Sequence, residues 1–499
     1  MTDGRASAIG RVWTGFKGLK DRPLAVVLGA ALIASVVARF SVGVHAPLWI
    51  DEAWTGAIAG QSDWPSVLRQ TWLDANAPLY YAFMHLWIGL FGQSDAALRL
   101  PSILIGATLP LLALFLPAKG LEREDRMLLA GMLAVWIEGI SQGSLARCYP
   151  FLLAFALVQT LAFVRLLNRQ DLKSGAIFAL CAALTVTTHY QALMLTGAEG
   201  LVLIGAMRLK VLRLAPAALA FAPALAVLLW HAPRLAQFAR PDVAWYDLVD
   251  WDTVGMTARW LIGSPWLYVL PGAGLLGLVA FWATGGERPP TAPWLAALAS
   301  LGGLFLMLGV GAFRPSFSLR YATPMVPGIF LGIALSLRAL TPAFTGARAA
   351  FLLLMLVACA DWTGRAATYT GRLFNYEIAS RDLLATHPSR LVFVWDHPAQ
   401  AVEDPSQYAA AGGYFFKRAG SKAEIVPVLF RPGDEPNQRL LRAAQAPGSV
   451  ILWLYDTGVR GTFARTAPPR ISDLDPSFGC RQYGAGRLGV YACARPFRK

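Results

Sequence analysis

The sequence has 499 residues, of which 15% are charged and 56% are hydrophobic, and its mean hydropathy is +0.48. Water-soluble domains carry about 25% charged residues, so this composition excludes a soluble globular enzyme and indicates a chain that lipid surrounds over much of its surface. The net charge of +14 therefore has to be interpreted by its position along the chain and not as a sign of nucleic-acid binding, and five scattered cysteines exclude a disulfide scaffold or a zinc cluster.

Charge-poor apolar runs long enough to cross a bilayer, about 20 residues each, occur eleven times. The first run lacks a signal-peptide cleavage pattern, so we expect it to be retained as an anchor. Residues 1–362 are thus predicted to form a polytopic α-helical membrane domain. The predicted spans lie near 24–44, 98–118, 127–144, 149–167, 174–188, 190–207, 214–231, 264–283, 292–313, 321–339 and 348–362.

Lysine and arginine in short loops set the orientation of such a chain. Most of them fall on one side of the predicted spans, which we take as cytoplasmic: segments 1–23, 119–126, 165–173 and 208–213, with Arg288, Arg338 and Arg348. This assignment of the loops to the two sides requires that the apolar stretch Pro78–Gly92, about 15 residues long, lies in the headgroup plane and does not cross the bilayer. If it crossed instead, the basic clusters would face outward. The main external loops are then 45–97 and 232–262.

Residues 363–499 differ in composition, because charged residues return and short apolar strands alternate with helix-like stretches. This pattern predicts a C-terminal extracytoplasmic α/β domain with strands near 391–395, 425–429, 450–454 and 488–493. Cys480 and Cys493 are compatible with a disulfide in an oxidising compartment, and equally with two free thiols.

Carboxylates gather in the first external loop. Asp51 and Glu52 follow the first span in the sequence WIDEAWT, between tryptophans that anchor at the headgroup level. Asp74 follows in DANAPLYY. A general base needs a fixed position near the proton that it removes, so Asp51 and Glu52 are candidate catalytic residues. The alternative is that they cap the following helix, since Asp is a common N-cap residue.

Arginines at the external ends of spans supply the cationic half of a candidate site. A guanidinium group binds phosphate through two parallel hydrogen bonds and keeps its charge. The alternative is that these side chains reach ordinary anionic headgroups. His189 also lies at an external end of a span. It is expected either to donate a hydrogen bond in the site or to have a structural role only. The candidate phosphate-binding residues are Arg99, Arg147, Arg314 and Arg320.

The external loop 232–262 interleaves aromatic residues, among them Trp245, Tyr246 and Trp260, with aspartates. Aromatic faces and carboxylates suit sugar binding, and a loop of this length can close over a donor; the alternative is an interfacial aromatic belt. Several external carboxylates leave room for a divalent cation, but no ligand spacing compels one. No metal site and no certain cofactor is therefore predicted.

Taken in order, these segments resemble the GT-C superfamily of integral-membrane glycosyltransferases, in particular the branch of protein O-mannosyltransferases and lipid A aminoarabinose transferases. WIDEAWT resembles the Asp-Glu motif after the first span, and DANAPLYYAFMHLW resembles the Asp-x-His-Pro-Pro-Leu segment. ALRLPSILIGATLPLLALFL is similar to the Arg-containing second span. SLARCYPFLLAF and THYQALML fit the next external turns, and RYATPMVP resembles the start of a late span. The resemblance covers roughly residues 45–330.

The resemblance implies a GT-C fold and transfer of a monosaccharide from a polyprenyl-phosphate donor, by an inverting displacement, to a glycolipid, cell-wall glycan or protein acceptor. It implies that Asp51 is the catalytic carboxylate, that Glu52 supports it, and that Arg99 holds the loop or the donor phosphate. The His-Pro pair of the family is Asn76-Ala77 here, so the role of that His is not carried over.

The complete hypothesis places Arg147 and Arg320 on the leaving phosphate, where prepositioned cations stabilise developing charge. The expected location is a bacterial inner membrane with the site facing the periplasm. The alternatives are a polytopic transporter of lipid or solute without transferase activity, which would carry its ionisable residues near the midplane, and a non-catalytic assembly factor. The predicted substrate-binding residues are Asp74, Asn76, Tyr80, Tyr149, His189, Trp245, Tyr246 and Tyr321.

Overall fold

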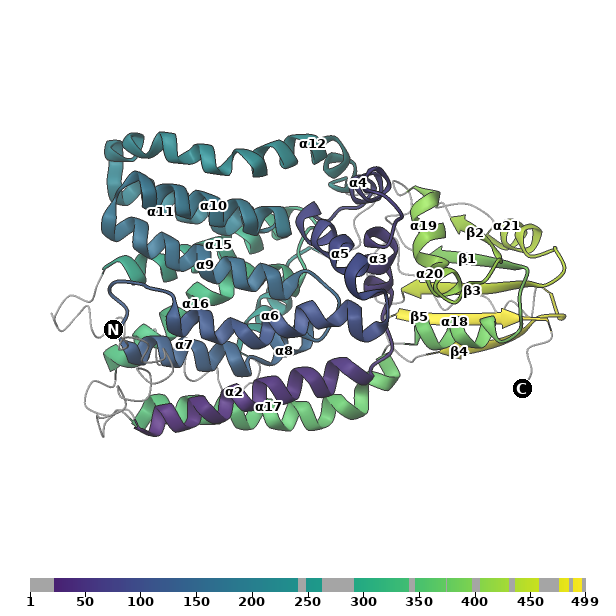
Figure 1. Ribbon diagram of the computed structural model, residues 1–499, viewed down its shortest axis with the longest axis horizontal. Helices are drawn as coiled ribbons and strands as arrows, with labels where there is room; N and C mark the ends of the chain where they lie inside the picture. Colours follow the sequence, from purple (N-terminus) through teal and green to yellow (C-terminus); the bar gives the residue numbers. More distant parts are fainter. Residues whose placement is uncertain are drawn as a thin grey trace, which may run out of the picture.

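The structure is a computed structural model that describes most of the chain as helix, with one small sheet. Figure 1 shows a bundle of long helices with an α/β domain attached at one end. The described residues are 22–240, 248–262, 291–340, 346–373, 375–396, 404–429, 436–456, 475–483 and 488–495.

The bundle consists of apolar helices whose backbone groups are paired within each helix, as a lipid environment requires. Seven described stretches are long and apolar enough to cross a membrane, so the chain is a multi-pass membrane protein. The helices are α2 (Arg22–His45), α6 (Asp95–Phe115), α7 (Arg123–Val135), α8 (Ile137–Gly143), α9 (Tyr149–Arg169), α10 (Leu172–Thr188), α11 (Ala192–Met207), η3 (Arg208–Phe221), α12 (Ala222–Phe238), α15 (Thr291–Phe313), α16 (Val326–Leu340) and α17 (Gly346–Leu373).

Ten of the eleven predicted spans overlap described helices, and the span at 264–283 lies outside the described residues. One apolar stretch runs from Ala192 to Phe238. Its helix breaks at Arg208, whose φ is 52°, and the 14 residues of η3 separate α11 from α12, which Figure 1 shows as separate rods. The predicted span 127–144 is two helices that meet at Trp136. The number of crossings stays a prediction.

Three short helices lie between the bundle and the α/β domain (Figure 1): α3 (Ile50–Ala59), α4 (Trp64–Leu73) and α5 (Pro78–Phe91). Asp63 caps α4 by accepting a hydrogen bond from the Ser66 amide at 2.8 Å. The 14 residues of α5 extend about 21 Å at 1.5 Å per residue, less than the roughly 30 Å of a hydrocarbon core. This length agrees with the prediction that Pro78–Gly92 does not cross.

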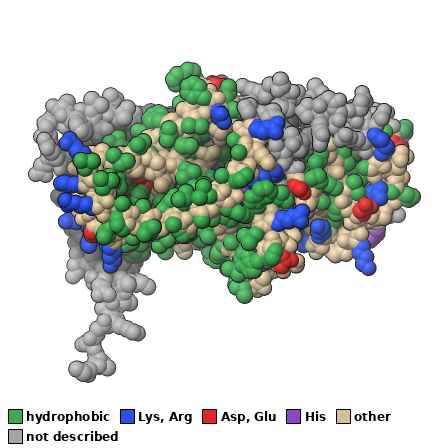
Figure 2. Space-filling model, turned by 90° about the horizontal axis from the view of Figure 1, so that it is seen from above, with side chains coloured by type: hydrophobic (Ala, Val, Ile, Leu, Met, Phe, Trp, Pro, Cys, Tyr) green, Lys and Arg blue, Asp and Glu red, His purple; other side chains and the backbone are tan. Residues whose placement is uncertain are grey.

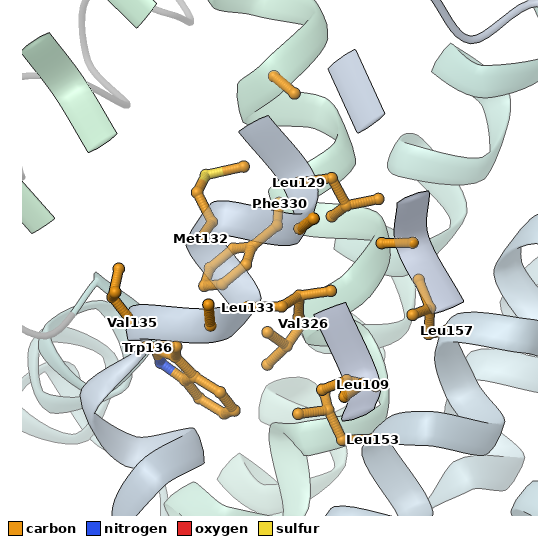
Figure 3. Close-up of a cluster of buried hydrophobic side chains, with 14 of the residues drawn as sticks. Leu109, Leu129, Met132, Leu133, Val135, Trp136, Leu153, Leu157, Val326 and Phe330 are labelled. Atoms are coloured by element: carbon orange, nitrogen blue, oxygen red, sulfur yellow. The ribbon is translucent and has the colours of Figure 1, made fainter. Parts of the chain in front are cut away.

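The bundle core lies where α7, α9 and α16 meet. Figure 3 shows Met132 and Leu133 of α7 beside Val326 and Phe330 of α16. Because lipid tails are as apolar as leucine, such packing gains mainly from van der Waals contact. Trp260 of α13 (Trp251–Ile262) joins this core at 4.9 Å from the Trp136 ring and is only 7% exposed. The expectation that Trp260 helps to bind sugar is therefore wrong, because its ring is packed inside the protein.

The C-terminal domain has a five-stranded sheet in the order β2-β1-β3-β5-β4, with β1, β2 and β3 parallel and β3, β5 and β4 antiparallel. The predicted α/β domain is confirmed. Cys480 and Cys493 face each other on β4 and β5 and form a disulfide. The elements are α18 (Tyr376–Leu384), β1 (Arg390–Asp396), α19 (Pro405–Gly412), α20 (Tyr414–Arg418), β2 (Glu424–Leu429), α21 (Pro436–Ala443), β3 (Ser449–Asp456), β4 (Gly479–Tyr483) and β5 (Leu488–Ala494).

Charged side chains lie mainly at the two ends of the molecule and are of mixed sign over the α/β domain (Figure 2). Figure 2 shows hydrophobic side chains over the middle of the bundle and lysine and arginine side chains gathered at the end opposite the α/β domain. The positive-inside rule predicts that this basic end faces the cytoplasm. It therefore predicts an external position for the α/β domain and for α3–α5.

Candidate active site

Asp51 lies in the first turn of α3 and faces two arginines from distant parts of the chain. Arg320 Nη1 is 3.0 Å from Asp51 Oδ2, and Arg147 Nη2 is 3.8 Å from the same oxygen. Arg147 also donates to the backbone carbonyl of Asp51 at 3.0 Å. The Asp51 side chain is 20% exposed and that of Arg320 is 24% exposed. The cluster is therefore open, and two cations share one carboxylate.

Local structure holds each arginine in place. Arg147 lies in the turn between α8 and α9, where its amide donates to the Leu145 carbonyl at 2.8 Å. Arg320 lies in the short helix η6 (Leu319–Met325), which Thr323 closes by donating to the Arg320 carbonyl at 2.6 Å. The guanidinium of Arg320 also lies 5.8 Å from the centre of the Tyr149 ring, a cation–π distance. Both charges are thus prepositioned beside Asp51.

Glu52 and Arg99 form a separate, fully buried ion pair. Arg99 Nε and Nη2 each donate to one Glu52 oxygen at 2.6 Å. The Glu52 carboxylate also accepts from the amides of Ala146 at 2.8 Å and Trp49 at 3.0 Å. The remaining Arg99 N–H groups donate to the carbonyls of Gly43, Ala46 and Pro47.

This geometry differs from the expectation that Glu52 is catalytic and that Arg99 binds the donor phosphate. A buried ion pair is stable only when its hydrogen-bonding capacity is filled, and here no group of either side chain is left to face a substrate. The capping alternative holds in part, because Glu52 accepts from the Trp49 amide at the start of α3. The pair instead fixes the loop before Asp51.

Asp74 lies at the end of α4, close to a second group of predicted residues. Its Oδ2 accepts from Tyr81 Oη at 2.6 Å and from Asn76 Nδ2 at 2.9 Å. Burial and the Asp74 carboxylate raise the pKa of Tyr81 well above its ordinary value, so the phenol remains a donor. A small pocket next to these residues is lined by Asn76, Ala77, Tyr80, Tyr81, Arg147, Cys148 and Thr188.

An aromatic wall continues from Arg320. The His189 ring lies 5.9 Å from Tyr149 and 4.8 Å from Tyr321. Burial, together with the charges of Arg320 and Arg147, lowers the pKa of His189 to about 3, so the imidazole is neutral near pH 7. Its Nδ1 accepts from the Gln191 amide at 3.3 Å, which assigns the proton to Nε2. Predicted residues from three turns thus meet in one place.

Other predicted residues are not part of this cluster. Arg314 is exposed at the end of α15, and the described residues show no contact between it and Asp51. Trp245 and Tyr246 lie outside the described residues. Where the structure describes the chain, no three His, Cys, Asp or Glu side chains are arranged to hold a metal ion. Tyr81 was not predicted, although its neighbour Tyr80 was.

Solved structures share this architecture. ArnT from Cupriavidus metallidurans bound to undecaprenyl phosphate matches with a TM-score of 0.57 at 10% identity, over 97% of this chain and 98% of that one. The archaeal oligosaccharyltransferase AglB from Archaeoglobus fulgidus, in complex with an inhibitory peptide and a dolichol-phosphate, matches with a TM-score of 0.50 at 11% identity, over 98% of this chain and 75% of that one. No protein-family model and no curated protein matches the sequence.

The chain is therefore a multi-pass membrane protein with the fold of the GT-C superfamily of membrane glycosyltransferases. The matches extend over both the helical bundle and the α/β domain. At such low identity they establish the fold alone, and the chemistry has to be argued from the side chains.

Proposed function

We propose that this protein transfers a monosaccharide from a polyprenyl-phosphate donor to an extracytoplasmic acceptor. The observation that carries the proposal is the open cluster in which Arg147 and Arg320 face Asp51, at the end of the bundle next to the α/β domain (Figure 1). Both guanidinium groups lie within 4 Å of the Asp51 carboxylate, and cations held in this way are suited to bind a phosphate monoanion. An arginine guanidinium binds two phosphate oxygens through two parallel hydrogen bonds and does not lose its charge.

In the proposed reaction, the donor phosphate binds between Arg147 and Arg320 and separates them from the Asp51 carboxylate. The released carboxylate accepts the proton of an acceptor hydroxyl or amine as that atom bonds to the anomeric carbon. The bond from the anomeric carbon to the phosphate oxygen breaks, and the electron pair leaves on the polyprenyl phosphate. Such a direct displacement inverts the anomeric configuration.

The remaining residues support binding. Arginines held by the fold stabilise the charge that develops on the leaving phosphate without reorganising. Tyr321 is partly exposed and offers an aromatic face to the sugar, whereas the rings of His189 and Tyr149 are buried and support this wall from within. Asn76, which donates a hydrogen bond to Asp74, lines the pocket beside Arg147.

The membrane bundle gives the lipid tail of the donor a place to lie. The solved structures of similar fold include one with undecaprenyl phosphate and one with a dolichol-phosphate, which favours a lipid phosphate as the ligand here. A bacterial inner membrane with the site facing the periplasm is the proposed location. The acceptor class is a glycolipid, a cell-wall glycan or a protein.

The test uses the full-length protein in lipid nanodiscs with a panel of undecaprenyl-phosphate-linked sugars and membrane extracts as acceptors. We expect release of undecaprenyl phosphate together with a labelled acceptor, and loss of one sugar from envelope glycans in cells that lack the protein, measured by mass spectrometry. Counterflow of a solute or lipid into vesicles without transfer of label would contradict the proposal and favour a transporter.

A further inference from the structure

The loop that leads into α3 is held by buried charged side chains at every residue from Ala46 to Trp49. Arg99 binds the carbonyls of Ala46 and Pro47. The amide of Leu48 donates to Glu377 Oε2 at 2.6 Å, and the amide of Trp49 donates to Glu52 Oε2 at 3.0 Å. Each of these four consecutive residues thus has a backbone group bound to a charged side chain, and α3 with Asp51 begins directly after them.

One of these side chains comes from the other domain. Glu377 is in the first turn of α18, in the α/β domain, and is fully buried. Its second oxygen, Oε1, forms an ion pair with Arg381 and lies 3.5 Å from Arg418 Nη2. Arg418 in turn binds Asp95 Oδ1 at 2.5 Å in the first turn of α6. The α/β domain is therefore tied to both the loop and the helix that carries Arg99.

Burying a carboxylate at this interface costs free energy unless it is paired and hydrogen-bonded. The buried carboxylate is not needed to attach the domain to the bundle, because apolar side chains already do so. Ile50 and Ala53 of α3 pack in one cluster with Tyr376, Phe393 and Tyr414 of the domain. What the carboxylate adds is direction, since a charged acceptor on one amide fixes where the chain enters α3. Leu48 precedes Asp51 by three residues.

We propose that Glu377 is a positioning residue, which sets the place of Asp51 through the Leu48 amide and so makes the α/β domain part of the catalytic apparatus. The claim that Glu377 affects turnover rests on the proposed function. The claim that Glu377 fixes the Leu48 amide and the loop before α3 does not. Reacting groups tolerate little displacement, since a shift of about 1 Å can cost on the order of 100-fold in rate. A carboxylate that only stabilised the domain would affect unfolding and leave the rate constant unchanged.

The test compares Glu377→Asp with the wild type in full-length protein in nanodiscs. The shorter side chain keeps the charge for Arg381 and Arg418 and withdraws the oxygen from Leu48. Hydrogen–deuterium exchange of a peptide covering residues 46–52 reports the loop, and undecaprenyl phosphate release reports turnover. The matched control is Glu424→Asp, at an exposed carboxylate paired with Arg390 at 2.7 Å in the same domain.

We expect exchange in this peptide to accelerate by about tenfold or more as the amide loses its acceptor, and kcat to fall about 10- to 100-fold. KM for the donor should stay within about twofold, because the arginines that bind phosphate are untouched. The control should change neither. Unchanged exchange, or faster exchange with unchanged kcat, would overturn the inference.

Failure of the two proposals can be told apart. A wild-type protein that releases no undecaprenyl phosphate with any donor contradicts the proposed function and, with it, the effect of Glu377 on turnover. Accelerated exchange in Glu377→Asp would then still support the claim that Glu377 fixes the loop before α3. If Glu377→Asp lowers the melting temperature, Glu377→Gln separates loss of stability from loss of the Leu48 hydrogen bond, because glutamine keeps an oxygen for the Leu48 amide. Exchange of the 46–52 peptide near the wild-type rate in Glu377→Gln supports the positioning role of Glu377. Exchange as fast as in Glu377→Asp overturns it.

Discussion

Arg320 Nη1 lies 3.0 Å from Asp51 Oδ2, although the two residues are 269 positions apart in the sequence. The contact joins α3 to η6 at the end of the bundle next to the α/β domain (Figure 1). Arg147 approaches the same oxygen at 3.8 Å. One carboxylate therefore contacts two guanidinium groups, and in the proposed function the donor phosphate replaces it between them. The roles of the carboxylate and of the arginines are separable by substitution.

Asp51→Asn removes the proposed base while keeping the size of the side chain. We expect transfer to fall by about 10²- to 10⁴-fold, the usual range for loss of a general base, with membrane insertion and thermal stability retained. Release of undecaprenyl phosphate under single-turnover conditions measures this. Asp63→Asn is the matched control: Asp63 is an exposed N-cap residue of α4, and Asn caps equally well. Full activity of Asp51→Asn would sink the proposed mechanism.

Arg320→Gln tests the phosphate site apart from the chemistry. Hydrogen bonds between charged groups contribute about 1.5 to 3 kcal/mol each, so the Kd for undecaprenyl phosphate should rise about 10- to 100-fold. A titration followed by intrinsic tryptophan fluorescence in nanodiscs measures it. Arg314→Gln removes the same charge from an exposed position on the same side and should leave the Kd unchanged. Equal effects of the two variants would mean that general surface charge, and not a built site, attracts the lipid.

Glu52→Gln should harm the fold more than Asp51→Asn does. Breaking a buried ion pair from one side costs about 3 to 5 kcal/mol, because the partner charge stays buried and unpaired. We therefore expect a lower melting temperature and a lower yield of folded protein, measured by thermal unfolding in detergent. The opposite order, with Asp51→Asn the less stable of the two, would contradict the structural role that the Arg99 contacts assign to Glu52.

Much of the fold could be predicted because the bilayer imposes a simple rule: about 20 apolar residues make a span. The α/β domain was found by its apolar strands, whereas β4 was missed. Its sequence GCRQY is a polar edge strand, and edge strands need not be apolar. The break at Trp136 was missed too, since the apolar run at the end of α7 continues through Trp136 to Ile137, the first residue of α8.

The site was predicted in part. Asp51, Arg147 and Arg320 could be placed together because topology brings the external ends of spans to one face. The division of roles between Asp51 and Glu52 could not, since neighbours on a helix point about 100° apart and only the packing of α6 decides which one is buried. Glu377 was also missed: its contact with Leu48 spans 329 residues and leaves no local signal.

His189 should make the protein sensitive to acid. Burial lowers the pKa of His189 from its ordinary value of 6.5 to about 3 in the folded state. As the pH falls, the unfolded chain therefore takes up this proton at a higher pH than the folded protein does. The stability that depends on neutral His189 is complete above about pH 6.5 and is lost as the pH falls toward 3, at up to about 1.4 kcal/mol per pH unit. His189→Gln should flatten the melting temperature between pH 6 and pH 4 relative to the wild type. An unchanged slope would show that other groups control it.

Gly56 sets the distance between α3 and the α/β domain. A Cβ atom at this position would lie 2.5 Å from Cζ and Oη of Tyr414. Tyr414 is 4% exposed, and the Arg418 guanidinium lies 5.5 Å from the centre of its ring, so the ring has little room to move. Gly56→Ala should cost about 1 to 3 kcal/mol, as overpacking of a buried contact does.

The change should also lower transfer, because α3 carries Asp51. Melting temperature and undecaprenyl phosphate release measure the two effects. Gly89→Ala is the control: no atom lies within 4 Å of its added Cβ, so this helix-interior substitution should stabilise by about 0.5 to 1 kcal/mol. The double variant Gly56→Ala with Tyr414→Leu should lose less stability than the two single variants lose together, because the smaller side chain removes the clash. Strict additivity would show that the close approach of α3 to Tyr414 does not limit the packing of the domain.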